Sequence, residues 1–301
     1  MMSDTTLLNE KSPVSEIMAK LGHSIKFITR SRSLFLGSIG FLIIMVIILG
    51  TPFFLSTDPL TMDYGSILQP PSRGFLLGTD DLGRDLLARV IYGGQASIMI
   101  GLQVMLVTMV FGTFTGLITG YFQRVDMLLM RFMDILMSFP SLLLAIAVLA
   151  VMGNNPIGVV IALSVVYTPR TARVIRSAVF SLREEMYVES AKAIGATTGR
   201  ILVKYILPGV VPALVVQETF LFAYAILGEA GLSFVGVGIQ PPTPSWGNIL
   251  GDARVLIRQA PWLLFAPGLA IMLTVLSLNL VGDGLREALD PKRRKLPMMR
   301  R

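Results

Sequence analysis

The sequence predicts an all-α polytopic membrane protein with six transmembrane helices, and three observations support this prediction. Hydrophobic residues make up 53% of the 301 residues and charged residues only 15%, whereas soluble domains carry about 25% charged residues. Several uncharged segments are long enough to cross a bilayer core of about 30 Å as a helix. The chain has no cysteine and a single histidine, His23. Disulfides, thiolate metal sites and a histidine-based catalytic triad therefore cannot be built from this chain alone.

The first transmembrane helix is predicted over residues 34–55, because no charged residue interrupts this segment. As a helix it would be about 33 Å long. It starts too late and is too long for a cleavable signal peptide, so we expect it to remain as an anchor. Residues 1–33 combine apolar residues at helical spacing with lysine and arginine, which predicts an amphipathic segment along the inner membrane surface. The alternative is that no helix forms before residue 30.

Five further spans are predicted in the region 94–291. The uncharged segments place them near residues 96–121, 131–152, 157–178, 205–228 and 259–282. The uncharged run 135–169 would be about 52 Å long as one helix, which exceeds a single crossing. The sequence Gly-Asn-Asn-Pro at 153–156 is a strong turn signal inside this run, so it is divided into two spans.

The distribution of lysine and arginine predicts the topology. Residues 1–33, 123–134, 170–204 and the tail from 283 hold 21 of these residues, and the loops 56–93 and 229–258 hold 5. Positive residues accumulate in cytoplasmic loops, so both termini, including the basic tail 292–301, are predicted to be cytoplasmic. The two poorly charged loops are predicted to be periplasmic. The net charge of +7 is therefore interpreted as a topology signal, and no nucleic-acid binding is expected.

Loop 56–93 carries acidic and basic residues at helical spacing. Asp80 and Arg84, and Asp85 and Arg89, are acid-first i,i+4 pairs, which predict an interfacial helix beginning at this point. Together with Asp81 these carboxylates also suggest a divalent-cation site. Because no supporting cluster of acceptor groups is visible in the sequence, we interpret them as capping and ion-pairing residues.

The second outer loop, 229–258, contains a rigid proline-rich segment. Its prolines include Pro241 and Pro242, which follow Gln240 and stiffen the chain in an extended form. Trp246 and Trp262 are expected in the aromatic belt at the membrane interface. Such a loop suits either contact with an extracytoplasmic partner or a cap over the helix bundle, and the sequence leaves both open.

Two sets of polar residues lie within predicted spans. Glu218 is the charged residue of the fifth span, so it must face a polar interior, the translocation path or a partner chain. Proton coupling would use such a residue, but no further acids or histidines are apparent in the other spans. Arg170, Arg173 and Arg176 recur every three residues, as in a voltage sensor. Snorkelling at the inner end of the fourth span is the preferred interpretation.

The second predicted span also contains a packing motif. Gly112, Gly116 and Gly120 recur every four residues and predict a groove where another helix approaches closely.

The inner segment 184–200 predicts a knob of two short helices on the cytoplasmic side. Gly195 divides the helices and is expected to need a positive φ. Ser190, Ala191 and Ala193 are small and would let another surface approach. The knob contains no catalytic group, so it suggests a mechanical link to a soluble subunit.

The residues of this segment resemble the EAA loop of ABC importer permeases. In that pattern Glu-Ala-Ala is followed by three residues, Gly, nine residues, Ile, any residue and Leu-Pro. This chain departs from it at Ser190 and at Tyr205. The matching residues are Glu189, Ser190, Ala191, Gly195, Ala196, Leu207 and Pro208. Segments 78–85, 240–247 and 282–291 are similar to the C-type subunits of the dipeptide, oligopeptide and nickel permeases.

This resemblance covers about residues 20–292 and implies a type I ABC importer permease fold. It implies a heterodimer with a homologous B-type permease subunit, two ABC ATPase subunits docked on a coupling loop at 183–208, and a periplasmic or lipid-anchored solute-binding protein. ATP and Mg would be bound by the ATPase subunits, because the chain has no Gly-Lys dipeptide and hence no P-loop. No cofactor, metal or enzymatic activity is expected in this chain.

The implied substrates are dipeptides, oligopeptides or related small solutes such as nickel, metal chelates and glutathione-like compounds. Two alternatives are a self-sufficient secondary transporter or channel and a membrane-embedded enzyme. The second alternative would need a convergent set of acids, histidines or metal ligands within the spans, which the sequence lacks.

Overall fold

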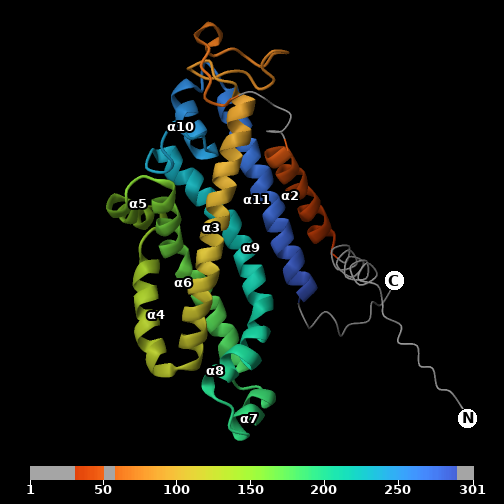
Figure 1. The fold of residues 1–301 in the computed structure, drawn as a ribbon, viewed down its shortest axis with the longest axis vertical. Helices are drawn as coiled ribbons and strands as arrows, with labels where there is room; N and C mark the ends of the chain where they lie inside the picture. Colours follow the sequence, from red (N-terminus) through yellow and green to blue (C-terminus); the bar gives the residue numbers. More distant parts are fainter. Residues whose placement is uncertain (1–30, 51–57, 290–301) are drawn as a thin grey trace, which may run out of the picture.

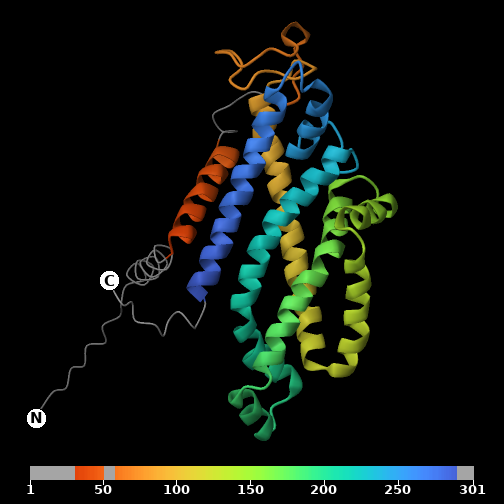
Figure 2. The ribbon, with the colours of Figure 1, turned by 180° about the vertical axis from the view of Figure 1, so that it is seen from behind.

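The computed structural model describes residues 31–50 and 58–289, and over these residues its regular elements are helical. The predicted amphipathic segment before residue 31, the end of the first predicted span and the basic tail 292–301 lie outside the described residues. Figures 1 and 2 show an elongated bundle in which α3, α6 and α9 run side by side, with α2 and α11 on one flank and α4 and α5 on the other. We call the end that carries α7 the knob end.

Five described segments are long and apolar enough to cross a membrane. They are α2 (Arg32–Gly50), α3 (Leu86–Tyr121), α6 (Pro156–Leu182), the continuous run Thr198–Val235 and α11 (Trp262–Leu289). The run Thr198–Val235 consists of α8 (Thr198–Arg200), the π-helical η3 (Ile201–Ile206) and α9 (Leu207–Val235). The short helices η2 (Tyr64–Ser66) and α10 (Trp246–Leu256) lie at the end opposite the knob.

The prediction of a continuous helix over 131–152 is wrong, because two helices joined by a sharp bend occupy this region, as in a broken span or a re-entrant loop. α4 (Gln123–Ser138) and α5 (Ser141–Met152) meet at an angle of 100°. The break falls at Phe139 and Pro140. Phe139 is extended, with φ −83° and ψ 142°, because a proline disfavours helical geometry in the residue before it. The turn at Gly153 that separates α5 from α6 is confirmed.

Two other predicted boundaries are also wrong. Residues 80–85 form a turn rather than the start of an interfacial helix, and α3 begins at Leu86 with Asp85 as its N-cap. α9 continues to Val235, so residues 229–235 belong to a helix and not to the outer loop.

The predicted glycine groove of the second span is the contact between α3 and α6. A Cβ atom built on Gly112 would lie 2.6 Å from the Thr171 side chain, and one on Gly116 would lie 2.6 Å from the Ile175 Cβ. Gly120 faces Val179 in the same way. The three glycines therefore let α6 approach the backbone of α3 at three successive turns, as small residues do in membrane helix pairs.

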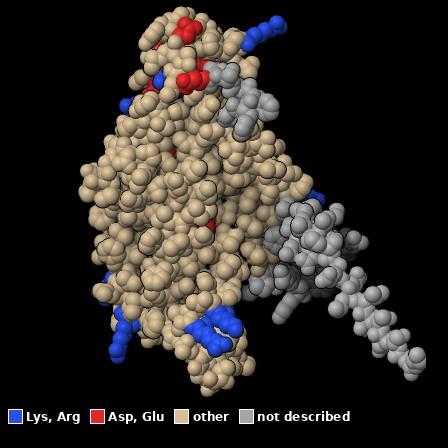
Figure 3. All heavy atoms as spheres, in the orientation of Figure 1, with Lys and Arg blue, Asp and Glu red and all other residues tan. Residues whose placement is uncertain are grey.

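Charged side chains gather at the two ends of the molecule. On the face drawn in Figure 3, lysine and arginine lie mainly near the knob end, acidic residues lie at the opposite end, and the surface between them is almost uncharged. Exposed apolar side chains such as Phe111, Phe114 and Leu276 contribute to the surface between the ends. Such an apolar belt is the surface that a bilayer requires of a helical bundle.

Candidate functional site

The knob consists of α7 (Met186–Ala193) and α8, joined by a turn at Gly195. Gly195 has φ +81°, which confirms the predicted positive value. The Gly195 N–H donates to the Lys192 carbonyl and the Ala196 N–H donates to the Ala191 carbonyl, each at 3.0 Å. These bonds satisfy carbonyl groups at the end of α7, which is the role of a glycine directly after a helix.

One face of the knob is anchored to the rest of the chain. Val188 is fully buried and Ala191 is 3% exposed. Val188 belongs to an apolar cluster that includes Ile201 and Ile206 of η3. Ala191 therefore points inward, and the prediction that it lies with Ser190 on an accessible small-residue face is wrong for this residue.

The opposite face of the knob is exposed. Glu189 and Ser190 are both accessible to solvent. Met186 and Ile194 are each 81% exposed, which leaves large apolar side chains uncovered at the tip. An exposed surface that combines apolar groups with a carboxylate is typical of a protein–protein contact rather than of a catalytic site.

The link between the knob and the bundle is continuous. Leu207 and Pro208 open α9, and the π-helical turn η3 ends directly before them. Proline lacks the N–H that a regular α-helical turn needs and its ring crowds the preceding turn, which favours a locally widened helix at this point. Leu207 is half-buried and Pro208 is exposed. The knob is thus joined to α9 through η3 without an intervening loop.

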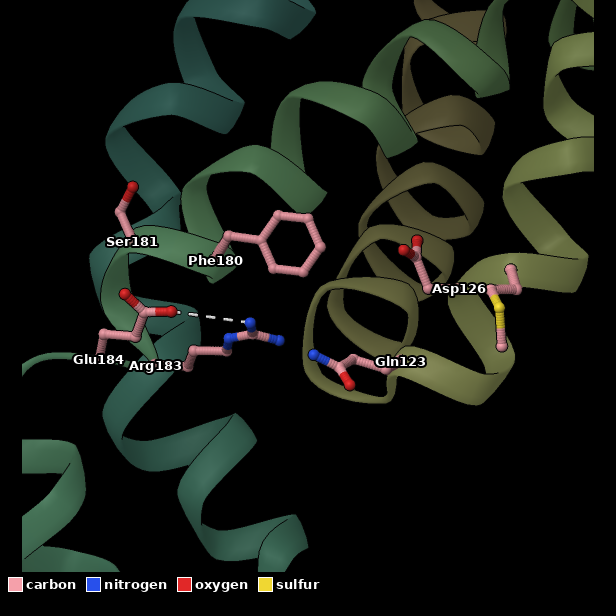
Figure 4. A pocket seen from close by; sticks show the side chains of 7 residues that line it. Gln123, Asp126, Phe180, Ser181, Arg183 and Glu184 are labelled. Atoms are coloured by element: carbon pink, nitrogen blue, oxygen red, sulfur yellow. Dashed lines mark ion pairs between the residues drawn. The ribbon is translucent and has the colours of Figure 1, made fainter.

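A hollow of about 590 Å³ adjoins the knob, between the corner of α3 and α4 and the end of α6. Figure 4 shows that Arg183 points from the end of α6 toward Gln123 at the start of α4. The Arg183 guanidinium lies 3.6 Å from the Glu184 carboxylate and donates to the Gly120 carbonyl at 3.1 Å. Asp126, on the far wall, pairs with Arg176. The walls of this hollow are therefore charged, and their charges are balanced.

Glu218 lies between three helices of this chain. It is 3% exposed, and its two carboxylate oxygens accept hydrogen bonds from Thr108 of α3 at 3.0 Å and Thr171 of α6 at 2.7 Å. The structure thus gives Glu218 a polar interior, which is one of the three surroundings expected for it. Contact with the translocation path or with a partner permease stays a prediction.

A second buried carboxylate, Glu229, was missed by the sequence analysis. It is fully buried in α9 and accepts hydrogen bonds from Ser97 of α3 and Ser233 of α9, each at 2.7 Å. The signal was present in the sequence, because Glu218 and Glu229 are separated by about three helical turns and so lie on one face. The predicted outer loop 229–258 includes residue 229, so the prediction does not place Glu229 on this helix face.

The acidic residues of the outer loop form a buried ionic cluster. Asp80 is 1% exposed. It lies 2.6 Å from the Arg84 guanidinium and 2.5 Å from that of Arg89, and Arg89 also reaches Asp252 of α10 at 3.4 Å. Partial burial raises the pKa of the Asp252 carboxyl, although Arg89 acts in the opposite direction.

The outcome differs among the predicted ion-pairing residues. The Asp80–Arg84 pair is confirmed, whereas Arg89 pairs with Asp80 instead of Asp85. Asp81 is half-exposed and lies 3.9 Å from Arg84. Within the described part of the chain, no group of three or more acidic or histidine residues is placed to hold a metal ion.

The proline-rich outer loop has an exposed tip and a buried base. Gln240, Pro241 and Pro242 are exposed. Trp246 is 1% exposed, and its indole N–H donates to the Val90 carbonyl of α3 at 2.8 Å. The prediction that Trp246 lies in the interface belt is therefore wrong, because the start of α10 packs into the bundle and carries the indole inside it.

Comparison with known proteins agrees with this architecture. The family model for the binding-protein-dependent transport system inner membrane component matches residues 108–295. The putative peptide transport system permease protein of Brucella suis biovar 1 is 42% identical over 286 residues, which cover 93% of this chain and 97% of that protein. The dipeptide transport system permease protein DppC of Alkalihalophilus pseudofirmus is 43% identical over 261 residues, covering 85% and 86%. The glutathione transport system permease protein GsiD of Pectobacterium atrosepticum is 44% identical over 231 residues, covering 76% and 77%.

Proposed function

This chain belongs to the family of binding-protein-dependent transport system inner membrane components, and from that premise we propose that it forms half of a translocation path for peptides. It is a multi-pass transmembrane permease of an ABC importer, and a permease of this family is not itself an enzyme. The proposal of peptides as substrates is supported by the names of relatives that align over most of their length.

The single observation that carries the coupling mechanism is the two-faced knob at 184–200. Its buried face contains Val188 and Ala191, and Val188 shares an apolar cluster with residues of η3 and α9, while Glu189 and the apolar tip residues are exposed. A separate ATPase subunit binds the exposed face. When that subunit moves the knob, η3 and α9 move together with the knob. ATP and Mg are bound and used by that subunit, and this chain receives the motion.

We propose the remaining partners on the basis of family membership. A homologous B-type permease completes the translocation path, and two ATPase subunits dock at the knob end. A periplasmic or lipid-anchored solute-binding protein delivers the peptide at the opposite end, where Gln240, Pro241 and Pro242 are exposed. Both termini lie in the cytoplasm, in agreement with the distribution of lysine and arginine.

The test combines Glu189→Lys and Gly195→Val in the assembled complex. Glu189→Lys reverses the charge on the exposed face. Gly195→Val strains a residue at φ +81° that has nothing within 4 Å of an added Cβ, so its cost of about 1–2 kcal/mol is conformational rather than steric. Gly199→Ala is the matched control, because it also adds a Cβ in open space but without a positive φ.

We expect both variants to lower substrate uptake, with ATPase subunits lost or no longer stimulated by the loaded binding protein. Gly199→Ala is expected to retain both activities. Normal uptake by the double variant would exclude this segment as the coupling element. Uptake by the chain without any ATPase subunit would overturn the proposed function and favour a self-sufficient transporter.

A further inference from the structure

Arg170 is an exposed cation near the middle of α6, a helix apolar enough to cross a membrane. Its guanidinium carbon lies 5.6 Å from the centre of the Tyr167 ring and 5.7 Å from the centre of the Tyr224 ring. No carboxylate among the described residues lies within ion-pair distance of this guanidinium. Arg170 is therefore held by aromatic rings, and no carboxylate of residues 31–50 or 58–289 compensates its charge.

The two arginines that follow on α6 differ from Arg170 in this respect. Arg173 lies 2.7 Å from the Asp134 carboxylate, and Arg176 pairs with Asp126. Both carboxylates belong to α4, so the charges of these two arginines are balanced within the chain. The three arginines thus do not form a uniform ladder, and Arg170 needs an explanation of its own.

The rings of Tyr167 and Tyr224 position the Arg170 guanidinium without occupying its N–H donors. Tyr167 is 7% exposed, and its hydroxyl donates to the Tyr224 carbonyl of α9 at 3.2 Å. This bond joins the Tyr167 ring of α6 to the backbone of α9 at Tyr224. A cation over the faces of aromatic rings is attracted to them, while the planar fork of N–H groups stays available for an anion.

The face that carries Arg170 continues into a hollow of about 510 Å³ between α6, α9 and α11. Val174, one turn after Arg170, and Phe220, one turn before Tyr224, both line this hollow. Gln217 and Arg286 are polar groups in its wall. Arg170 lies near the middle of α6 and not at the inner end, where snorkelling is expected. Because unpaired charges at membrane depth avoid lipid, we infer that this face meets either water or a partner chain.

We propose that Arg170 binds the free carboxylate of a peptide as it passes through the permease. This inference rests on the proposed function. Guanidinium groups bind carboxylates through two parallel hydrogen bonds. A terminal carboxylate is the anionic group that peptides of different side chains share, so one arginine on this path serves peptides of many sequences.

The first experiment tests whether this face is accessible to water and whether Arg170 makes its electrostatic potential positive. The chain has no cysteine, so Gln217→Cys provides a single labelling site in this subunit of the full complex in lipid nanodiscs. Its rates of reaction with a negatively and a positively charged methanethiosulfonate reagent are measured by the mass of this chain. Arg170→Gln should lower the ratio of the rate with the negatively charged reagent to the rate with the positively charged reagent by about threefold at low salt. Arg173→Gln is the matched control and should leave the ratio unchanged.

The second experiment compares uptake of trialanine and trialanine amide by the complex with its loaded binding protein, each normalised to the wild-type complex. Arg170→Gln should lower trialanine uptake by about tenfold or more and affect the amide by less than about twofold. Arg170→Lys keeps the charge but loses the planar fork, so it should fall between wild type and Arg170→Gln.

Several results would overturn the inference. An unchanged labelling ratio in Arg170→Gln, or no reaction of Gln217→Cys with either reagent, would show that Arg170 does not face a wet path. Equal losses for both peptides, accompanied by a lower yield of the two-permease complex, would assign Arg170 to a carboxylate of the partner permease instead. Absence of ATP-driven uptake by the wild-type complex would overturn the proposed function itself, which separates that failure from failure of the carboxylate site.

Discussion

Asp80 and Arg89 form a buried ion pair, with 2.5 Å between the Asp80 Oδ2 and the Arg89 Nη1. Asp80 belongs to the loop opposite the knob, and Arg89 belongs to the first turns of α3. The other Asp80 oxygen accepts hydrogen bonds from the backbone N–H groups of Leu82 and Arg84, each at 2.9 Å. One carboxylate therefore shapes the loop and joins it to the start of a membrane-spanning helix.

Asp80→Asn is expected to destabilise the outer end of the protein. The substitution leaves Arg84 and Arg89 buried beside each other without the carboxylate, and breaking a buried pair in this way costs about 3–5 kcal/mol. The midpoint of thermal unfolding of the purified protein measures the effect. Asp81→Asn is the control, because Asp81 is 47% exposed and lies 3.9 Å from Arg84, so its loss should cost less than about 1 kcal/mol. Equal midpoints for the two variants would contradict this account of the cluster.

Gly116→Ala is expected to weaken the contact between α3 and α6. Its Cβ would lie 2.6 Å from the Ile175 Cβ and 2.7 Å from the Ala172 carbonyl oxygen, and overpacking of this kind costs about 1–3 kcal/mol. Gly268→Ala in α11 has nothing within 4 Å of the added atom. It should be neutral or slightly stabilising, since alanine is the better helix former. The yield of folded protein after detergent extraction compares the two, and a larger loss for Gly268→Ala would refute the packing argument.

Glu218→Gln should be tolerated better than Glu218→Leu. The amide keeps an oxygen that accepts from one of the two threonines, whereas leucine leaves the fully buried Thr171 hydroxyl without its partner. An unsatisfied buried polar group costs about 1–3 kcal/mol. Thermal stability and transport are measured on both variants. If the leucine variant is more stable and more active than wild type, Glu218 has no polar role.

Single cysteines test the topology, because the chain has none of its own. Tyr64 is 71% exposed at the end opposite the knob, and Thr197 is exposed in the knob. An impermeant thiol reagent applied to intact cells should label Tyr64→Cys and should not label Thr197→Cys until the membrane is opened. The reverse pattern would place the knob outside and exclude a cytoplasmic ATPase as its partner.

The approximate positions of five membrane segments could be predicted from the sequence because lipid imposes a local requirement. Each spanning helix must be apolar over its own length and must satisfy its own backbone hydrogen bonds. Uncharged runs therefore located α2, α3, α6, α9 and α11 without knowledge of their neighbours. The positive φ at Gly195 was predictable for a similar reason, because a short helix closes with a glycine directly after it.

The errors arose where local patterns have two structural outcomes. Pro140 breaks the span 131–152 into α4 and α5, although prolines such as Pro169 and Pro212 are accommodated inside long helices. The carboxylates of residues 80–85 have the spacing of a helix, but this segment folds into a turn in which Asp80 accepts from the backbone N–H groups of Leu82 and Arg84. Tryptophan is enriched at membrane interfaces, but the helix that carries Trp246 packs against α3 and buries the indole.

The sequence by itself determined the apolar membrane segments and the glycine turn of the knob at 184–200, because hydrophobicity, charge bias and glycine turns act over short stretches of chain. The resemblance of the knob residues to the EAA loop indicated a permease. Only the tertiary structure decided what the polar groups within the helices contact. Thr108 and Thr171 meet Glu218, Ser97 meets Glu229, and Tyr167 and Tyr224 meet Arg170. Most of these contacts join different helices, and they depend on which faces of the helices pack together. Packing of that kind is set by the shapes of many side chains at once and leaves no local pattern in the sequence.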